Sequence, residues 1–387
     1  MALIEAIQAM AGEMTAWRRD IHKHPELGFE ENRTADFVAA KLEEFGLQVV
    51  RGVGKTGVVG VLRIGNETRS IGLRADMDAL PIHEQNTFDH RSCHDGVMHA
   101  CGHDGHTTML LGAAKYLAES QAFRGQVNFI FQPAEEGIGG ARAMIEDGLF
   151  EKFPCDVLYS MHNAPRLAVG TFAAISGVRT AAGAFFDIDI IGKGAHGAMP
   201  DQGVDPVLIT GELITSLQSI VSRNIRPTKT AVLSITQVHS GDAYNVIPAT
   251  ARLSGTVRTF DMQVMEQIER RMNEIANGIC AAHGGTAEVS FRTVFHPVLN
   301  DADVSETAAL VCEELVGSDN VHREGGPATG SEDFSFMSEL VPSCYINVGN
   351  GDSSPLHNHG YDFNDDALVY GASFYAGVVE KELAAEI

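Results

Sequence analysis

Strand-like apolar runs alternate with helical patterns over the first 165 residues, and this alternation constrains the possible fold more than any other feature. Helical periodicity covers 3–21, 34–45, 106–118 and 140–147, with Asn32 as a candidate cap of the helix at 34–45, and strand-like runs cover 47–50, 58–64, 71–75, 127–131 and 157–161. Strands that alternate with helices through short connections indicate a mainly parallel sheet covered on both faces. We therefore predict a doubly wound α/β domain, in which ligands bind beyond the carboxyl ends of the strands.

The pattern changes near residue 180. The next elements are a strand at 185–191, a helix at 205–222, strands at 231–238 and 251–258, a helix at 262–282 and a strand at 286–295. This β-α-β-β-α-β order is that of a ferredoxin-like α+β unit. The α/β pattern then resumes, with helices at 304–316, 332–339 and 366–384 and a strand at 344–348. We expect 1–181 and 296–387 to form one domain, interrupted by a second domain at 182–295.

Composition narrows the class of protein. A chain of 387 residues with 44% hydrophobic residues is long enough for two domains. The formal charge of −23 repels phosphate backbones and anionic membranes, so we expect neither nucleic acid nor membrane as a partner. The six cysteines have no short paired spacing, the N-terminus lacks signal-peptide features, and no apolar run approaches the roughly 18 residues of a membrane span. A cytoplasmic location with free thiols is the expectation.

The stretch MHACGHDGH at 98–106 concentrates metal-binding side chains. Cys101 and His103 flank Gly102, and alternate side chains of an extended segment point the same way. Thiolate and imidazole together suit zinc and the later first-row divalent metals. The alternative for this stretch alone is a tight turn with incidental histidines.

Further candidate ligands follow the predicted strands. Asp76, Asp78, Glu135, Glu136 and His162 stand just after strand ends, and His357 lies near the C-terminus. Adjacent side chains on extended backbone point apart, so one of the two glutamates can bind metal while the other takes a proton from water. The candidates outnumber the ligands of one zinc ion and suit two metals that share a bridging group.

Other catalytic patterns are missing from the sequence. There is no HExxH, no GxSxG and no zinc-deaminase motif, and the glycine-rich run at 52–57 lacks the glycine that a phosphate loop needs at Val49. Two further hypotheses stay open. Cys101 could act as a nucleophile with His103 or His106, in which case activity would survive metal removal. The chain could also be a noncatalytic binding protein.

These residues together resemble the M20 metallopeptidases, in the amidohydrolase subgroup of hippurate hydrolases, N-acyl-amino-acid amidohydrolases and auxin-conjugate hydrolases. The resemblance covers almost the whole chain. It rests on RRDIH at 18–22, HPE at 24–26, RADMDALP at 74–81, MHACGHDGH at 98–106, PAEEG at 133–137, MHN at 161–163, GAHG at 194–197, NVIP at 245–248, SEDF at 331–334, LHN at 356–358 and YDF at 361–363.

The resemblance implies a catalytic α/β domain with a smaller lid, and specific roles for individual residues. The implied metal ligands are Cys101, His103, Glu136, His162 and His357. Glu135 is implied as the general base, Asp78 as the carboxylate that orients the site, and His196 in the lid as a stabiliser of the oxyanion. Asn245 and Arg258 match lid positions that contact substrate.

Two positions depart from the family pattern. Asp76 stands at the position where many members of the wider family have the histidine of a His-x-Asp motif. Because that histidine ligand is missing here, Asp76 is left out of the implied ligand set. His359 is a second imidazole close to His357. The segment 86–95 also differs from the usual sequence of the amidohydrolase subgroup, which contains proline and serine. It is a candidate for lining the acyl pocket.

The expected reaction is hydrolysis of the amide bond of an N-acyl amino acid, which releases a carboxylic acid and a free amino acid. The expected cofactors are two divalent metal ions, manganese or zinc first and cobalt or nickel as alternatives. A metallo-carboxypeptidase or dipeptidase is the alternative activity. Similar proteins form dimers through the lid, so we expect a homodimer or homotetramer, in which His196 serves its own or a neighbouring subunit. The acyl group and the amino acid stay open.

Overall fold

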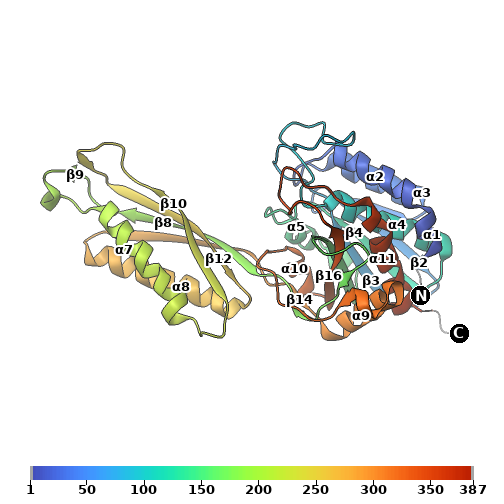
Figure 1. Cartoon of the computed structure of the whole chain (residues 1–387). Coiled ribbons are helices and arrows are strands. Elements are labelled where there is room, and N and C mark those ends of the chain that lie inside the picture. The colour runs from blue at the N-terminus through green and yellow to red at the C-terminus, as the bar shows by residue number, and fades with distance from the viewer. Residues whose placement is uncertain (1–2, 385–387) are drawn as a thin grey trace. The chain divides into compact units, whose positions relative to one another are not determined.

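The computed structural model describes residues 3–384, which divide into two compact units. The first unit contains the residues up to Arg179, Val298–Gly326 and the residues from Asp333 onward. The second unit contains Thr180–Pro297 and Pro327–Glu332. Figure 1 labels their helices and strands. The predicted α/β class is confirmed, and the role of the second unit as a lid stays a prediction.

An eight-stranded sheet forms the centre of the first unit, in the order β1-β2-β4-β3-β5-β16-β6-β15. Its strands are β1 Gln48–Val53, β2 Gly57–Ile64, β3 Ser70–Asp76, β4 Gly125–Gln132, β5 Val157–Pro165, β6 Phe172–Ala173, β15 Val321–His322 and β16 Ser343–Gly351. The four adjacent strands β4, β3, β5 and β16 are parallel. Their carboxyl ends therefore meet at one edge of the sheet, where the predicted ligands follow.

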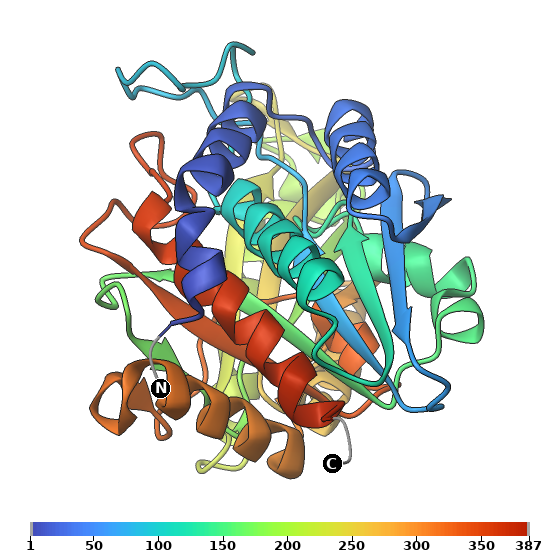
Figure 2. The ribbon, with the colours of Figure 1, turned by 90° about the vertical axis from the view of Figure 1, so that its right-hand side faces the viewer.

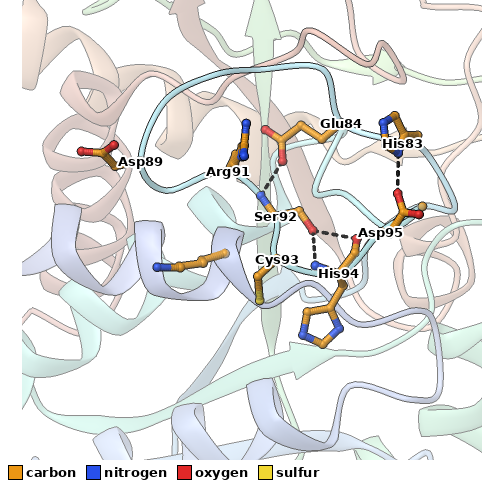
Figure 3. A pocket seen from close by; sticks show the side chains of 10 residues that line it. His83, Glu84, Asp89, Arg91, Ser92, Cys93, His94 and Asp95 are labelled. Atoms are coloured by element: carbon orange, nitrogen blue, oxygen red, sulfur yellow. Dashed lines mark hydrogen bonds and ion pairs between the residues drawn. The ribbon is translucent and has the colours of Figure 1, made fainter.

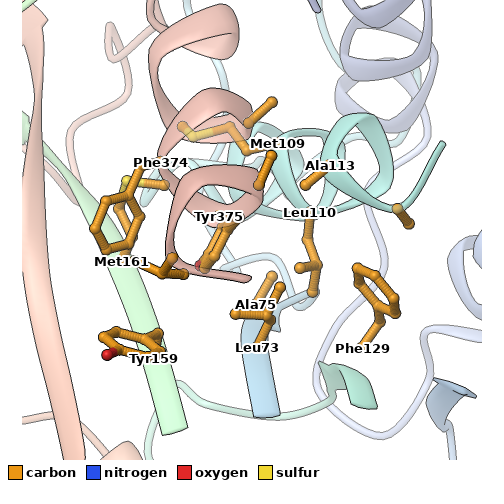
Figure 4. Packing of buried hydrophobic residues seen from close by; sticks show 14 of the residues in the cluster. Leu73, Ala75, Met109, Leu110, Ala113, Phe129, Tyr159, Met161, Phe374 and Tyr375 are labelled. Carbon is orange, nitrogen blue, oxygen red and sulfur yellow. The ribbon is translucent and has the colours of Figure 1, made fainter. Parts of the chain in front are cut away.

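The side chains of the central strands alternate between two cores. Leu73 and Ala75 on β3 join Phe129 and Met161 in the larger core, whereas Ile130 faces the smaller one. Figure 4 shows how Met109, Leu110 and Phe374 pack over the larger-core side of these strands. Every residue of β3 is buried, as expected of a parallel strand covered on both faces.

Helices cover both faces of this sheet. The larger core receives side chains from α1 Glu5–Ala9, α2 Ala11–Lys23, α3 Asn32–Glu44, α4 His103–Ser120, α9 Ala302–Val316 and α11 Leu368–Glu382. Figure 2 shows this group of helices in front of the sheet. The opposite face receives α5 Gly140–Glu146, α6 Leu149–Lys152 and α10 Phe334–Ser338.

Two local expectations were wrong. The first predicted helix is interrupted at Met10, which separates α1 from α2. Asn32 does not cap α3, because Glu31 occupies the cap position and Asn32 lies inside the helix.

The second unit is a four-stranded antiparallel sheet with two helices on one face. Its strands are β8 Ala182–Ile191, β10 Ala231–His239, β12 Thr250–Thr259 and β13 Thr286–Phe295, in the order β10-β12-β8-β13. The helices are α7 Pro206–Ser219 and α8 Met262–Ala282, and α7 continues into a π-helical turn at Ile220–Asn224. This order is that of the predicted ferredoxin-like unit.

Short elements complete the chain. β7 Gly177–Val178 pairs with β14 Leu299–Asn300, and β9 Ala195–His196 pairs with β11 Val246–Ile247. Short 3-10 helices occupy Pro200–Gln202, Ser318–Asn320 and Asp365–Ala367. No helix within residues 3–384 is long and apolar enough to cross a membrane.

Candidate metal centre

The Cys101-Gly102-His103 segment is a sharp turn and not an extended segment, so the prediction from alternating side chains was wrong. Gly102 has φ +93°, and His103 is already the first residue of α4. A Cβ atom at position 102 would overlap the side-chain amide of Asn163 and the hydroxyl of Tyr361. The turn brings Cys101 and His103 to the same site through a left-handed glycine rather than through strand alternation.

The predicted ligands come together around this turn. Cys101 Sγ lies 3.3 Å from His162 Nε2, and ligand atoms of Cys101, His103 and His162 all lie within 4.8 Å of one another. The same limit holds for the set Cys101, Glu136 and His357. His357 Nε2 lies 3.2 Å from Glu136 Oε1. Segments far apart in sequence therefore form one cluster of thiol, imidazole and carboxylate groups.

The two adjacent glutamates follow a backbone turn that buried carboxylates hold in place. Ala134 has φ +51°, an uncommon conformation for a residue with a side chain. Its N–H donates to Glu31 Oε1 at 2.8 Å, and the N–H of Glu136 donates to Asp78 Oδ2 at 3.0 Å. Glu135 is buried, and its ligand atom lies within 4.8 Å of those of Glu136 and His103. The base candidate therefore adjoins the ligand cluster.

Asp78 also orients His103. The Nδ1 atom of His103 lies 2.9 Å from the carbonyl oxygen of Asp78 and 3.1 Å from its Oδ1. The opposite ring nitrogen, Nε2, is buried and has no hydrogen-bond partner within residues 3–384. A histidine held at one nitrogen by a carboxylate, with the other nitrogen free, is the usual arrangement of a metal ligand.

The carboxylates around His103 and Cys101 favour positive charge at the imidazole and oppose negative charge at the thiol. Burial opposes protonation of His103, but the charges of Asp76 and Asp78 outweigh it and raise its pKa to about 10. Burial, together with the charges of Glu136 and Glu135, raises the pKa of the Cys101 thiol well above its usual range. A thiol nucleophile would need the opposite shift. The donor set therefore fits divalent cations, which would balance the carboxylates and stabilise a thiolate.

The structure separates the two C-terminal histidines. His357 has φ +59°, its N–H donates to the carbonyl of Ala100 at 2.8 Å, and its ring reaches Glu136. His359 belongs to none of the described ligand groups, and its carbonyl accepts from the N–H of Gln85 at 2.9 Å. The geometry therefore favours His357 as the ligand.

The remaining predicted residues lie in the second unit. His196 on β9 pairs with Val246 on β11, and the N–H of Gly197 donates to the carbonyl of Asn245 at 2.8 Å, so His196 and Asn245 are close together. His196 is exposed, and its Nδ1 accepts from the N–H of Ala198 at 3.0 Å. Arg258 lies on β12, where its guanidinium is 6.0 Å from the ring centroid of Phe185, and burial lowers its pKa.

Three features of the centre were not predicted from the sequence. Glu31 is far from Ala134 in the chain, and nothing local indicates their contact. His162 was expected at the end of its strand, but β5 continues to Pro165. Its neighbour Asn163 lies in one of the family motifs without an assigned role, yet its side chain donates to the carbonyl of Cys101 at 2.6 Å.

The segment 86–95 borders a cavity of about 550 Å³ that contains none of the predicted ligands. Figure 3 shows its polar wall, in which His83 Nδ1 lies 2.6 Å from Asp95 Oδ1 and the N–H of Ser92 donates to Glu84 at 2.6 Å. The lining residues are Lys23, His83, Glu84, Asp89, Arg91, Ser92, Cys93, His94, Asp95 and Gly96. That this segment lines an acyl pocket stays a prediction.

Comparison with known proteins identifies relatives over nearly the whole chain. A hippurate hydrolase from Campylobacter jejuni is 45% identical over 383 residues, which cover 99% of this chain and all of the relative. An N-acyl-L-amino acid amidohydrolase from Geobacillus stearothermophilus is 44% identical over 290 residues, 74% of this chain and 78% of the relative. A crystal structure of a dinuclear metal-binding peptidase of the M20 family from Bacillus subtilis has a TM-score of 0.84 at 34% identity, covering 97% of this chain and 99% of that one.

These likenesses agree with the ligand cluster at the carboxyl ends of the parallel strands. The similarity to the dinuclear peptidase and the grouped ligand atoms support two divalent metal ions. The predicted resemblance is confirmed over residues 72–381, which match Peptidase family M20/M25/M40. The family model matches most of the sequence, and a relative that is 45% identical aligns over 99% of the chain. The chain therefore belongs to peptidase family M20/M25/M40.

Proposed function

We propose that the protein hydrolyses the amide bond of N-acyl amino acids and releases a carboxylic acid and a free amino acid. The observation that carries this proposal is the position of Glu135, whose carboxylate adjoins the cluster of Cys101, His103, Glu136, His162 and His357. The family and the likeness to a hippurate hydrolase support the same substrate class.

The residues of the first unit divide into a binding set and a base. Two divalent cations held by Cys101, His103, Glu136, His162 and His357 would supply Lewis acidity, which activates water and polarises an amide carbonyl. Glu135 accepts a proton from the attacking water as the water oxygen bonds to the carbonyl carbon. The same proton then passes from Glu135 to the amide nitrogen, and the carbon–nitrogen bond breaks. Asp78 keeps His103 and the N–H of Glu136 in place during these steps.

The second unit supplies the other proposed contacts. We assign stabilisation of the oxyanion to His196, and contact with the substrate to Asn245 and Arg258. A guanidinium suits the free carboxylate of an N-acyl amino acid, because it can donate two parallel hydrogen bonds. Complementation between inactive variants tests whether His196 acts in its own or in a neighbouring subunit.

The identity of the metal, the cellular location and the oligomeric state are also proposals. Manganese or zinc is the proposed metal, with cobalt and nickel as alternatives. We propose a cytoplasmic homodimer or homotetramer assembled through the second unit, where Val207 and Leu208 on α7 and Val238 on the edge strand β10 are exposed. The molar mass in solution, compared between the wild type and Leu208→Glu, tests this assembly.

A substrate panel tests the function. Metal-free enzyme is loaded separately with manganese, zinc, cobalt or nickel and assayed on N-benzoyl, N-acetyl and longer N-acyl amino acids, with unblocked dipeptides as the comparison. We expect cleavage of the N-acyl amino acids, and loss of turnover by about 10²–10⁴-fold in Glu135→Gln at unchanged metal content. Cleavage of unblocked peptides alone would replace the proposal with a dipeptidase, and a fully active Glu135→Gln would remove the base assignment.

A further inference from the structure

A buried pair formed by Asp76 and His106 lies directly behind the ligand cluster. Asp76 is the last residue of β3, His106 lies in the first turn of α4, and both are almost completely inaccessible to solvent. The Nδ1 atom of His106 lies 2.6 Å from Oδ1 of Asp76. Neither residue belongs to the proposed ligand set. The site therefore contains a carboxylate and an imidazole whose role is not accounted for.

The hydrogen bonds of His106 define which nitrogen carries its proton. The backbone N–H of Asn163 donates to His106 Nε2 at 2.9 Å. A backbone N–H can only donate, so Nε2 is the unprotonated nitrogen and Nδ1 donates its hydrogen to Asp76. Both ring nitrogens are thus engaged within the protein. Although ligand atoms of Asp76, His103 and His106 lie within 4.8 Å of one another, His106 offers no free lone pair to a cation.

Asn163 connects His106 to the segments that carry two of the proposed ligands, Cys101 and His162. It follows His162 directly, and its carbonyl lies 2.7 Å from His162 Nδ1. Its side-chain amide donates to the carbonyl of Cys101, and its Oδ1 accepts from the hydroxyl of Tyr361 at 2.8 Å. The rings of His106 and His162 also lie against each other, with centroids 4.5 Å apart. His106 therefore supports the strand of His162, and Asn163 connects that strand to the turn of Cys101.

Asp76 is held firmly in its own position. The guanidinium of Arg74 donates to its Oδ2 at 2.8 Å, and the hydroxyl of Thr107 donates to its carbonyl at 2.9 Å. With one carboxylate oxygen on Arg74 and the other on His106, the carboxylate aims the imidazole in one direction.

We propose that Asp76 and His106 are positioning residues, which set the separation of Cys101 and His162 by fixing the Nε2 acceptor for the N–H of Asn163. This inference rests on the proposed function only in that it assigns Cys101 and His162 to metal binding. It gives Asp76 a role other than that of a ligand.

Metal affinity, measured without substrate, is the primary test. Variants His106→Gln, His106→Asn and His106→Leu are titrated with zinc in competition with a chromophoric chelator, and their cobalt-loaded forms are examined by absorption spectroscopy. A glutamine can place an oxygen near the position of Nε2, whereas an asparagine reaches only as far as Nδ1 and a leucine has no acceptor. We expect zinc affinity to fall by about 10–100-fold in His106→Leu and His106→Asn, the range usual for groups behind metal ligands, with substantial recovery in His106→Gln.

The cobalt spectrum reports on the geometry itself. The thiolate-to-cobalt band of the wild type should persist in His106→Gln and should shift or weaken in His106→Asn, because the distance between Cys101 and His162 is no longer fixed. The matched control is Tyr159→Phe, which removes a partly buried hydrogen bond to Glu382 from the same strand β5 and should leave both the affinity and the spectrum unchanged. If His106→Leu does not fold, the comparison of glutamine with asparagine still decides the question.

The outcomes separate this inference from the proposed function. Equal zinc affinity and equal cobalt spectra in His106→Gln, His106→Asn and the wild type would overturn the positioning role, whatever the activity. A wild-type protein that binds metal but cleaves no N-acyl amino acid would overturn the proposed function and leave the positioning role standing, provided that the affinity order holds.

Discussion

The carboxylate of Glu31 lies 2.8 Å from the backbone nitrogen of Ala134, the residue before the proposed catalytic base. Its other oxygen accepts the hydroxyl hydrogen of Thr56 at 2.5 Å. Burial raises the pKa of this carboxyl group. A side chain at the start of α3 thus holds the left-handed turn that presents Glu135 and Glu136 to the metal centre.

Replacement of Glu31 should therefore affect turnover more than metal content. In Glu31→Ala the N–H of Ala134 loses its buried acceptor, which costs about 1–3 kcal/mol of unfolding free energy. We expect a lowered kcat at nearly unchanged metal content, because the ligands on other segments keep their contacts. Glu31→Gln retains an oxygen for Ala134 and should recover most of the kcat. Equal activity of Glu31→Ala and the wild type would contradict this role.

Gly102 offers a second test of the backbone at the centre. An alanine at this position would be strained by its positive φ and would overlap Asn163 and Tyr361. We expect Gly102→Ala to lose metal binding and to unfold at a clearly lower denaturant concentration. Gly96→Ala is the matched control, because Gly96 has φ +77° but open space around it, so only the strain of about 1–2 kcal/mol applies. Similar losses in the two variants would show that the overlap is unimportant.

The buried His22 predicts a pH dependence of stability. Burial opposes its protonation, but the charge and hydrogen bond of Asp104 and the hydrogen bond of Glu84 outweigh it and raise its pKa to about 9. A pKa above the unfolded value of 6.5 means that the stabilisation is complete below pH 6.5 and is lost as the pH rises through 9. The charged or titratable groups that face His22 are Asp104, Glu84, Arg18, His90 and His99.

Urea unfolding of the metal-free protein between pH 6 and 9.5 measures this effect without contributions from metal affinity. We expect the unfolding free energy to decrease across this interval in the wild type, and the decrease to be smaller in His22→Gln. An identical pH profile in the two proteins would contradict the assignment.

Metal removal distinguishes the proposed centre from a thiol nucleophile. Chelation should abolish hydrolysis, and readdition of manganese or zinc should restore it. Metal at 100 times its dissociation constant stabilises the folded state by about 2.7 kcal/mol, so the chelated protein should unfold at a lower temperature. Full activity after verified removal of metal would favour Cys101 as a nucleophile.

The parts of the fold that depend on local pattern were predictable from the sequence. The strand at 286–295 and the helix at 262–282 have the limits read from their periodicity, because each is an amphipathic element bounded by turn residues. The predicted ligands were recognisable because thiol, imidazole and carboxylate side chains gather in motifs that resemble those of the M20 metallopeptidases. The sequence left the backbone at Gly102 open between an extended segment and a tight turn, because a CGH segment is compatible with both an extended and a left-handed conformation.

Contacts between distant segments could not be predicted in this way. The pairing of β9 with β11, which places His196 beside Val246, involves two residues on each side and leaves no periodicity. The contacts of Glu31 with Ala134 and of Asp76 with His106 depend on how elements pack, which spacing along one chain does not reveal.

The order of segments along the chain has a consequence for biosynthesis. Strand β5 ends at Pro165, but β16, its parallel neighbour in the sheet, begins only at Ser343. While the ribosome is still making the residues between them, the flank of β5 has no strand to bind and is open to unwanted pairing with other chains. The sheet can therefore be completed only after the segment of β16 has been made, and the residues that follow β16 bring His357 to the other ligands.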